Sequence, residues 1–302
     1  MAAARLKTAE RPLDETSRAE AQTFLAPAKI NLYLKVLGRR SDGYHELDSV
    51  MAKLDLADRV QLDFFQDGER DQLIAGAGAG LALPDGFDGP GNLALKAVGA
   101  FRALCGWPRR GVRIVLEKNI PLGAGLGGGS SDCAAVLKAL NASAPQPLSR
   151  DDLEALGLSL GADVPFFIQP KAVVRIGGIG EVFKKPQPFF NRWPGRAILL
   201  VNPGLHLSTA EVFKNLGLTN EPANNNLGPV SEPGPGDNDL FEAAARLVPD
   251  LRAVAQAVKA AKPVFWGMSG SGSTFWACQP HEAEKLPLEH PDWLVRRTAI
   301  MK

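Results

Sequence analysis

The sequence has few residues that form cross-links or bind metal ions. Its 302 residues include only three cysteines and four histidines. Cys105, Cys133 and Cys278 are far apart, odd in number and without a Cys-x-x-Cys pair. This pattern argues against both a disulfide framework and a zinc site. We therefore expect a protein of the reducing cytoplasm.

An excess of charge of one sign is also lacking. The 34 Lys and Arg residues nearly balance 33 Asp and Glu residues, which gives a formal net charge of +1 at pH 7. No overall field draws the chain to nucleic acid or to an anionic membrane surface. No apolar run reaches the roughly 18 residues that a membrane span needs. We expect neither nucleic acid nor membrane as a partner, and an anionic ligand must be held by local groups.

The length predicts two domains, because a single hydrophobic core rarely grows beyond ~250–300 residues. A stretch rich in proline and aromatic residues, at 184–195, indicates the connection between them. We expect an N-terminal domain at 21–186 and a C-terminal domain at 187–302. Residues 1–20 mix charges of both signs without the apolar core of a signal peptide, which predicts a disordered leader.

Strand and helix patterns alternate along the chain, which predicts an α/β or α+β class. Apolar and polar residues alternate, as in half-buried strands, at 28–37, 48–64 and 111–118. Helical spacing is found at 92–106, from about Ser131 to Leu140, and at 240–261 with a break at Pro249. Ser149 and Asp152 have the spacing of a capping box at a further helix. The segment 221–239, rich in Pro, Gly and Asn, predicts an exposed loop.

A glycine-rich stretch directly before the helix at Ser131 carries the strongest functional signal. Five of the seven residues from Gly123 to Gly129 are glycine. A helix start has unsatisfied N–H donors and a partial positive charge, and glycine lets an anion approach the backbone closely. The stretch therefore predicts a phosphate site. It is not a Walker A loop, because Gly129 stands where lysine would precede Ser130.

Two other interpretations of the glycines stay open. Gly123, Gly125 and Gly128 fit the dinucleotide pattern G-x-G-x-x-G. Such a site also needs an acidic residue about 20 positions later, at a strand end. Asp151 and Asp152 lie at that distance but at a helix start, which makes a nucleotide-binding oxidoreductase the lesser alternative. A plain flexible turn is the other interpretation, although each ordered glycine costs conformational entropy.

The motif PLGAGLGGGSSDCAA at 121–135 resembles the phosphate-binding motif of the GHMP small-molecule kinases. Segments 27–47, 160–167 and 267–274 occur in the order that this family shows, and the resemblance covers roughly 24–280. These segments are similar to the branch whose acceptor is 4-diphosphocytidyl-2-C-methyl-D-erythritol, in the non-mevalonate isoprenoid pathway. Asp132 departs from the family pattern, in which asparagine is more usual.

The resemblance implies a two-domain α+β fold, with an N-terminal domain like domain 2 of ribosomal protein S5 and a ferredoxin-like C-terminal domain. It implies ATP as phosphoryl donor, Mg²⁺ bridging the β- and γ-phosphates, a small-molecule substrate, and a monomer or homodimer. Ser131 is the candidate metal ligand. The ATP contacts that it implies are Asn92, Leu93, Lys118, Pro121, Gly123, Gly125, Gly127, Gly128, Gly129, Ser130 and Ser131.

The same resemblance makes Asp163 the general base for the acceptor 2-hydroxyl and Lys29 the cation beside it. The local patterns are less specific. An aspartate two residues before Pro165 is as often a helix N-cap, and a lysine on a strand edge is usually solvated. The substrate contacts that the resemblance implies are Asn31, Tyr44, His45, Thr209, Phe213 and Gly270.

Cytosine recognition is expected at Tyr44 and His45, since a flat ring and an imidazole suit the face and edge of a pyrimidine. Phe213 matches the family position on the other side of the base. Taken alone, Tyr44 and His45 would more often be a turn anchor and a surface histidine. A second glycine turn, at 267–273, is expected either to shape the pocket or to join two strands.

Two alternatives to this kinase remain. One is a nucleotide-binding sensor without chemistry, against which the presence of both Lys29 and Asp163 speaks. The other is a GHMP kinase that acts on a different alcohol, which would have no use for a cytosine clamp at 41–47. We expect the active site in the cleft between the two domains.

Overall fold

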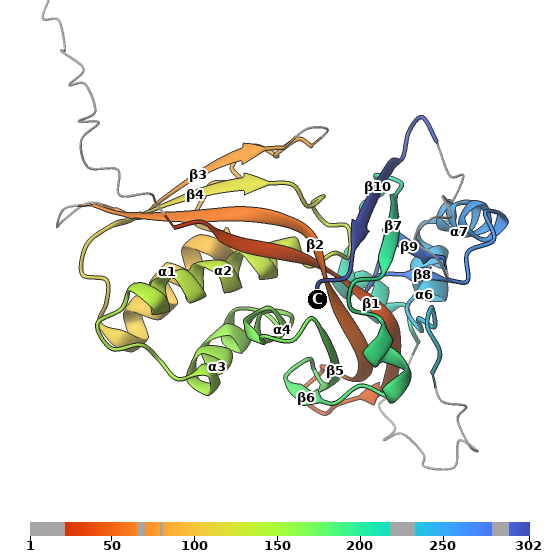
Figure 1. Ribbon diagram of the computed structural model, residues 1–302, viewed down its shortest axis with the longest axis horizontal. Coiled ribbons are helices and arrows are strands. Elements are labelled where there is room, and N and C mark those ends of the chain that lie inside the picture. The colour runs from red at the N-terminus through yellow and green to blue at the C-terminus, as the bar shows by residue number, and fades with distance from the viewer. Residues whose placement is uncertain (1–21, 66–69, 79–80, 218–232, 280–289) are drawn as a thin grey trace, which may run out of the picture.

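The computed structural model describes residues 22–65, 70–78, 81–217, 233–279 and 290–302 (Figure 1). The leader expected at 1–20 and most of the loop expected at 221–239 lie outside these ranges. Two β-sheets with helices packed on them confirm the α+β class. No helix in the described ranges is long and apolar enough to cross a membrane.

The first sheet is built on two long antiparallel strands that curve through the molecule (Figure 1). Apolar and polar residues alternate along both strands, but 26–34 and 49–54 are buried on both faces, so the prediction of half-buried strands is wrong there. Side chains of the second sheet pack against this part of the first sheet. The strand order is β3-β4-β2-β5-β6, and β1 also pairs with β2. Its strands are β1 (Phe24–Arg39), β2 (His45–Phe64), β3 (Gln72–Ala77), β4 (Val112–Lys118), β5 (Val173–Gly178) and β6 (Val182–Lys184).

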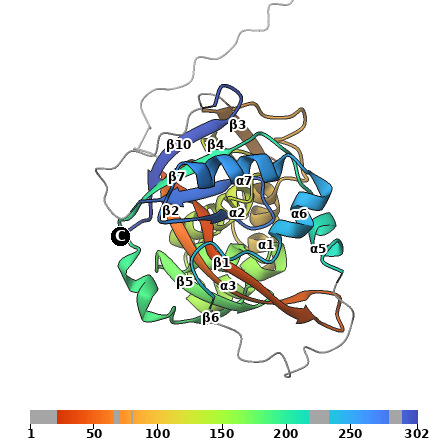
Figure 2. The ribbon, with the colours of Figure 1, turned by 90° about the vertical axis from the view of Figure 1, so that its right-hand side faces the viewer.

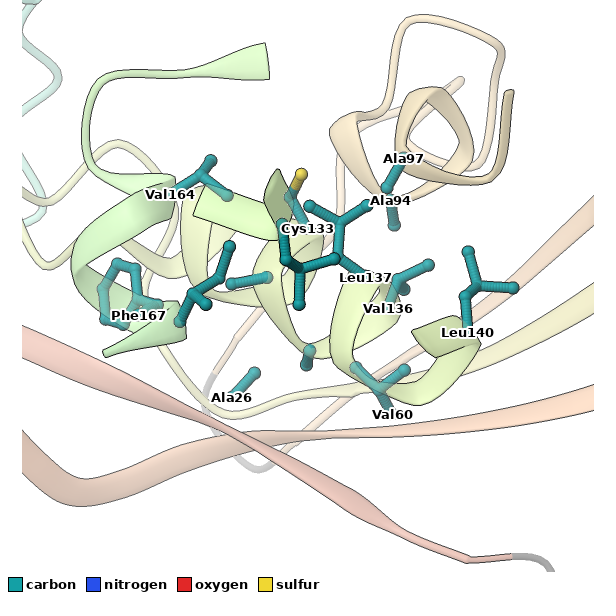
Figure 3. Packing of buried hydrophobic residues seen from close by; sticks show 14 of the residues in the cluster. Ala26, Val60, Ala94, Ala97, Cys133, Val136, Leu137, Leu140, Val164 and Phe167 are labelled. Atoms are coloured by element: carbon teal, nitrogen blue, oxygen red, sulfur yellow. The ribbon is translucent and has the colours of Figure 1, made fainter. Parts of the chain in front are cut away.

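Helices α1 (Leu93–Cys105), α2 (Gly128–Ser143), α3 (Arg150–Leu160) and α4 (Val164–Ile168) cover one face of this sheet (Figure 1). The central helix α2 is buried on nearly all sides and is rich in small residues, which lets α1 and α4 pack closely. Figure 3 shows this core, to which helices and strands both contribute. Its labelled members are Ala26, Val60, Ala94, Ala97, Cys133, Val136, Leu137, Leu140, Val164 and Phe167.

The expected helix ends are largely confirmed. Gly106 ends α1 in the left-handed conformation (φ 66°), and the Ser149 hydroxyl accepts a hydrogen bond from the Asp152 N–H at the start of α3. The start of α2 was expected at Ser131 but lies at Gly128. Glycines 128 and 129 adopt helical geometry, because the helix is held by tertiary packing despite the low helix propensity of glycine.

The second sheet has four antiparallel strands in the order β10-β7-β9-β8. They are β7 (Ala197–Asn202), β8 (Phe265–Met268), β9 (Phe275–Cys278) and β10 (Leu294–Ala299). Helices α6 (Phe241–Leu247) and α7 (Leu251–Ala260) lie over the outer face of this sheet, toward the viewer in Figure 2. The short helix α5 (Thr209–Lys214) follows β7.

Strand β7 shows how the two sheets share a core. Ile198 and Leu200 pack in one cluster with Ile30 and Leu54 of the first sheet. The alternate residues Leu199 and Val201 pack with α6 and α7. Both faces of β7 are therefore apolar, as in a strand buried on two sides. The stretch expected as the connection contains the 3₁₀ helix Pro188–Arg192 and contributes Phe190 and Trp193 to the same shared core.

Candidate active site

A cavity of about 910 Å³ lies where the first sheet, the helix α2 start and the second glycine turn meet. Its volume is near the upper end of the usual 300–1,000 Å³ for ligand sites. The structure brings most of the predicted site residues to its wall. These are Lys29, Asn31, Tyr44, His45, Leu93, Pro121, Gly123, Gly125, Gly127, Gly128, Gly129, Ser130, Asp163, Thr209, Phe213 and Gly270.

The first glycine loop rests on the second one. Gly125 has φ +75°, and a Cβ atom there would lie 2.8 Å from the Gly272 carbonyl oxygen and closer still to that of Ser269. The Ser269 hydroxyl donates a hydrogen bond of 2.9 Å to the Gly125 carbonyl. The Thr274 N–H donates one of 3.2 Å to the Ala124 carbonyl. The second turn therefore has a structural role in holding the first loop, as well as lining the cavity.

Only part of the glycine loop is open to a ligand. At Gly127, the N-cap residue of α2 with φ +70°, a Cβ atom would lie within 3.0 Å of Phe167 and Lys29 side-chain atoms. At Gly129 a Cβ atom would meet nothing within 4 Å. No side chain caps the first turn of α2, so its N–H groups face the cavity without that partner. This is the geometry of an anion site at a helix start.

Lys29 and Asp163 come together at the cavity wall. The Lys29 Nζ lies 3.8 Å from Asp163 Oδ2 and donates a hydrogen bond of 2.7 Å to Asn31 Oδ1. Burial lowers the pKa of Lys29, and the charge of Asp163 opposes that shift. The Asn31 side chain is fixed in turn, since its Nδ2 donates to the Ser49 hydroxyl at 2.8 Å.

The side chain of Asp163 does not form the capping hydrogen bond that one interpretation of this residue requires. The residue itself occupies the N-cap position of α4. The carboxylate is 36% exposed and lines the cavity. At the other end of α4, the carbonyls of Phe167 and Gln169 accept hydrogen bonds from Lys138 and Lys53. The helix is thus anchored while its first carboxylate faces the cavity.

Three of the residues predicted to bind ATP do not line the cavity: Asn92, Lys118 and Ser131. The Asn92 side chain caps α1, accepting a hydrogen bond from the Ala94 N–H at 2.9 Å. The Lys118 ammonium group is fully buried between the carboxylates of Asp58 and Asp132. Asp58 also accepts hydrogen bonds from the N–H groups of residues 119 and 120. Lys118 therefore joins the segment before the glycine loop to α2, and its charge is not available to a nucleotide.

The side-chain oxygens at the cavity decide how a magnesium ion fits. The Ser131 hydroxyl is buried without a hydrogen-bond partner, whereas Ser130 lines the cavity. Asp163 is the only carboxylate among the described lining residues. No cluster of three or more His, Cys, Asp or Glu side chains suited to a metal is found in the described ranges. The site fits an ion that arrives on a nucleotide, because Mg²⁺ keeps several waters and takes few protein oxygens.

A pair of aromatic rings also lines the cavity. The rings of His45 and Phe213 stack with centroids 4.8 Å apart and an interplanar angle of 29°. Because the His45 and Phe213 rings already stack on each other, a cytosine base does not fit between them. A sandwich around the base would therefore need the exposed ring of Tyr44 on one of its faces. Burial lowers the pKa of His45, and the charge of Arg39 adds to this shift. A neutral imidazole offers both a donor and an acceptor to a base edge.

The sequence interpretation missed several residues at the cavity. Ser49 fixes Asn31, and Ser271 forms a hydrogen bond of 2.8 Å with Thr209. Arg39 and Lys214 also line the wall. Strand alternation could have separated Arg39 from its neighbour Arg40, since successive side chains point to opposite faces. No local signal marks Ser49 or Ser271.

Comparison with known proteins agrees with this geometry. Residues 92–170 match the model of the GHMP kinases N terminal domain. A 4-diphosphocytidyl-2-C-methyl-D-erythritol kinase of Syntrophotalea carbinolica is 42% identical over 260 residues, covering 84% of this chain and 88% of the relative. The protein of that name from Geobacter sulfurreducens is 38% identical, covering 93% of this chain and 94% of its own.

Solved structures give the same result. The crystal structure of a 4-(cytidine 5'-diphospho)-2C-methyl-D-erythritol kinase superposes with a TM-score of 0.65 at 38% identity, over 85% of this chain and 90% of that one. A mevalonate kinase superposes with a TM-score of 0.64 at 17% identity, over 93% and 99%, which shows likeness of fold alone. On the identity and coverage of these relatives, the chain belongs to the 4-diphosphocytidyl-2-C-methyl-D-erythritol kinases of the GHMP kinase family.

Proposed function

We propose that the protein transfers the γ-phosphoryl group of ATP to the 2-hydroxyl of 4-diphosphocytidyl-2-C-methyl-D-erythritol, giving the 2-phosphate and ADP. One observation carries this proposal. The Lys29–Asp163 pair lies in the same cavity as the open helix start at Gly129 and the aromatic pair His45–Phe213. This arrangement supports a phosphate site, a base and a cytosine site within one cavity.

The chemistry asks the protein mainly to position groups and to balance charge. The acceptor oxygen attacks the γ-phosphorus as the bond to the β–γ bridging oxygen breaks, and the hydroxyl proton goes to Asp163. Lys29 balances the charge on the transferring group and orients Asp163. Asn31 fixes the Lys29 ammonium group through the 2.7 Å hydrogen bond between them.

ATP binds, in this proposal, with its phosphates at the first turn of α2 around Gly129. A bound magnesium ion would supply positive charge to the phosphates. Ser130 and Asp163 line the cavity and would offer side-chain oxygens to such an ion.

We also propose a domain division, a cellular compartment and an oligomeric state. We place the domain division at 186/187, although the two sheets share a core. All three cysteines are free thiols in the described chain, which supports a reducing cytoplasm. A monomer or homodimer is expected, and light scattering on the purified protein distinguishes the two.

A coupled ADP-release assay tests the activity. The acceptors are 4-diphosphocytidyl-2-C-methyl-D-erythritol, mevalonate, homoserine and galactose, each with saturating ATP and Mg²⁺. Turnover with the first acceptor alone is expected. Turnover with another alcohol would identify a different kinase of the family. Binding of NAD without ADP release would favour the oxidoreductase alternative, and ATP binding without turnover of any acceptor would favour a sensor.

A further inference from the structure

The cavity has positive charge beyond the catalytic pair. Among the described lining residues, Lys29, Arg39 and Lys214 are cationic and Asp163 is the single carboxylate. Lys29 is already paired with Asp163. Within the described chain, no ion pair involves Arg39 or Lys214. Two cations at the wall of a ligand cavity therefore remain to be explained.

Arg39 lies beside the aromatic pair. It is the last residue of β1 and pairs directly with His45 in the strand register. Side chains directly opposite each other in an antiparallel pair project from the same face. The effect of Arg39 on the pKa of His45 agrees with this proximity. The next residue, Arg40, does not line the cavity and forms ion pairs with Asp42 at 3.0 Å and Glu46 at 3.6 Å.

Lys214 lines the same cavity from α5, the helix that follows the second-sheet strand β7. It is the last residue of α5 and directly follows Phe213, whose ring stacks on His45. One cation thus comes from β1, opposite His45 in the strand register, and the other from α5, next to Phe213 in the chain. The Lys29–Asp163 pair lines the same cavity.

We propose that Arg39 and Lys214 bind the diphosphate that joins the cytidine and polyol parts of the substrate. This inference rests on the proposed function. Both cations line the cavity that also holds His45 and Asp163, the residues to which the proposal assigns the cytidine and the reacting hydroxyl of the substrate. A diphosphate that enters a cavity unpaired loses hydration that must be replaced. Arginine suits this task because its planar fork matches phosphate oxygens, and lysine adds a compact charge.

The arrangement makes the two cations determinants of substrate specificity. They select a cytidine diphosphate ester over free cytidine or an uncharged polyol, while the aromatic pair selects the base. ATP phosphates lie in our proposal at Gly129, so the two residues affect acceptor binding and not nucleotide binding. This separation provides the test.

Calorimetry with CDP and with cytidine tests the proposal. The ATP site is filled with a non-hydrolysable ATP analogue, so that CDP reports on the acceptor site alone. The variants are Arg39→Gln, Lys214→Gln and the double variant, with Arg40→Gln as matched control. Each single variant is expected to weaken CDP binding about tenfold, since one charge-assisted contact is worth about that factor. Cytidine binding and the Arg40→Gln variant stay unchanged.

Steady-state kinetics give the second readout. The KM for 4-diphosphocytidyl-2-C-methyl-D-erythritol rises in the Arg39→Gln and Lys214→Gln variants, while kcat and the KM for ATP stay at wild-type values. Equal weakening of CDP and cytidine, or no weakening of CDP, overturns the diphosphate role and leaves the proposed function standing. A raised KM for ATP alone also overturns it. A wild-type protein that binds neither CDP nor cytidine overturns both proposals.

Discussion

Lys29 and Asp163 lie 134 positions apart in the chain, yet the Lys29 Nζ is 3.8 Å from Asp163 Oδ2. Lys29 is on the long strand β1, and Asp163 directly precedes α4. The two elements are held by different means, β1 by its pairing with β2 and α4 by packing against α2. Asn31 contacts the lysine from its own strand face. The pair that we propose to be catalytic is therefore held by a paired strand and a packed helix.

The first prediction concerns this pair. Asp163→Asn and Lys29→Met are each expected to lower kcat by about 10²–10⁴, because they remove a positioned base and a charge beside the transferring group. Burial of Lys29 lowers its pKa, so Lys29→Met also relieves a desolvation cost. The Lys29→Met variant should therefore be at least as stable as wild type. Single-turnover rates, ATP binding and thermal melting measure the three effects.

Undiminished single-turnover rates in Asp163→Asn would contradict the role of the base. A loss of ATP binding equal to the loss of rate would place Asp163 in nucleotide binding instead. Melting curves separate either result from a failure to fold.

The second prediction uses two glycines of the same loop. Gly125→Ala is expected to destabilise the protein by at least about 1–3 kcal/mol, because φ is +75° and the new methyl group would overlap carbonyls of the second turn. Gly129→Ala meets no protein atom within 4 Å. It should leave stability equal or slightly higher, because alanine favours a helix, and raise the KM for ATP. Urea denaturation and steady-state kinetics measure the two variants.

The reverse pattern would contradict this division of the loop. A destabilised Gly129→Ala variant with a normal KM for ATP would mean that the open space at α2 is not the phosphate site. A stable Gly125→Ala variant would show that the second turn gives way easily.

The sequence predicted β1, β2, β4 and most helices because their patterns are local, whereas β3, β5, β6 and β10 were not predicted. Alternation along β1 and β2 and the cap residues Gly106 and Ser149 each act within a few positions. The glycine motif likewise identified a helix start open to an anion. Recognition of the family then supplied roles for Asp163 and Lys29, which their local patterns alone did not favour.

The contacts that the sequence could not give are long-range. Nothing near Lys118 indicates that Asp58 and Asp132, on two other elements, surround its ammonium group. The need for glycine at 125 also comes from a turn about 145 positions later, a separation that no local pattern encodes. These contacts depend on how the helices and strands pack. Gly125 and Gly129 therefore cannot be told apart in the sequence, although their surroundings in the structure differ.

The third prediction concerns this buried triad. Lys118→Met leaves two buried carboxylates without their cation, which should cost about 3–5 kcal/mol of stability. Asp132→Asn should instead raise the free energy of unfolding at pH 8. Burial, aided by Asp58, raises the pKa of Asp132 to about 7 against the pull of Lys118. The stability that this carboxyl contributes in acid is lost as pH rises from about 4 to about 7.

Asparagine at this position is uncharged at every pH and keeps an oxygen for the Lys118 ammonium group. The stability of Asp132→Asn relative to wild type is therefore expected to rise with pH over that range. Chemical denaturation at pH 5 and pH 8 measures it. A difference between variant and wild type that is equal at both pH values would show that Asp132 stays ionised throughout.

The last prediction concerns Lys53, which donates a hydrogen bond to the Gln169 carbonyl and lies 5.3 Å from the Phe166 ring centre. Burial, with a smaller effect from the charge of Lys138, lowers its pKa from 10.5 to about 7. The unfolded chain therefore binds more protons at this residue between these two pH values. Stability should rise as pH increases through this window, by at most about 1.4 kcal/mol per pH unit.

Lys53→Met removes this dependence while keeping an unbranched side chain of similar length. Its stability relative to wild type is expected to be highest near pH 7 and to fall steadily toward pH 9.5. The reason is that the free-energy cost of deprotonating the buried wild-type lysine on folding becomes smaller as pH rises. The exposed Lys171→Met serves as control and should follow wild type at every pH. Urea denaturation at half-unit pH steps measures the three proteins. Parallel curves for Lys53→Met and wild type would mean that the buried ammonium keeps its proton, stabilised by the carbonyls at the end of α4.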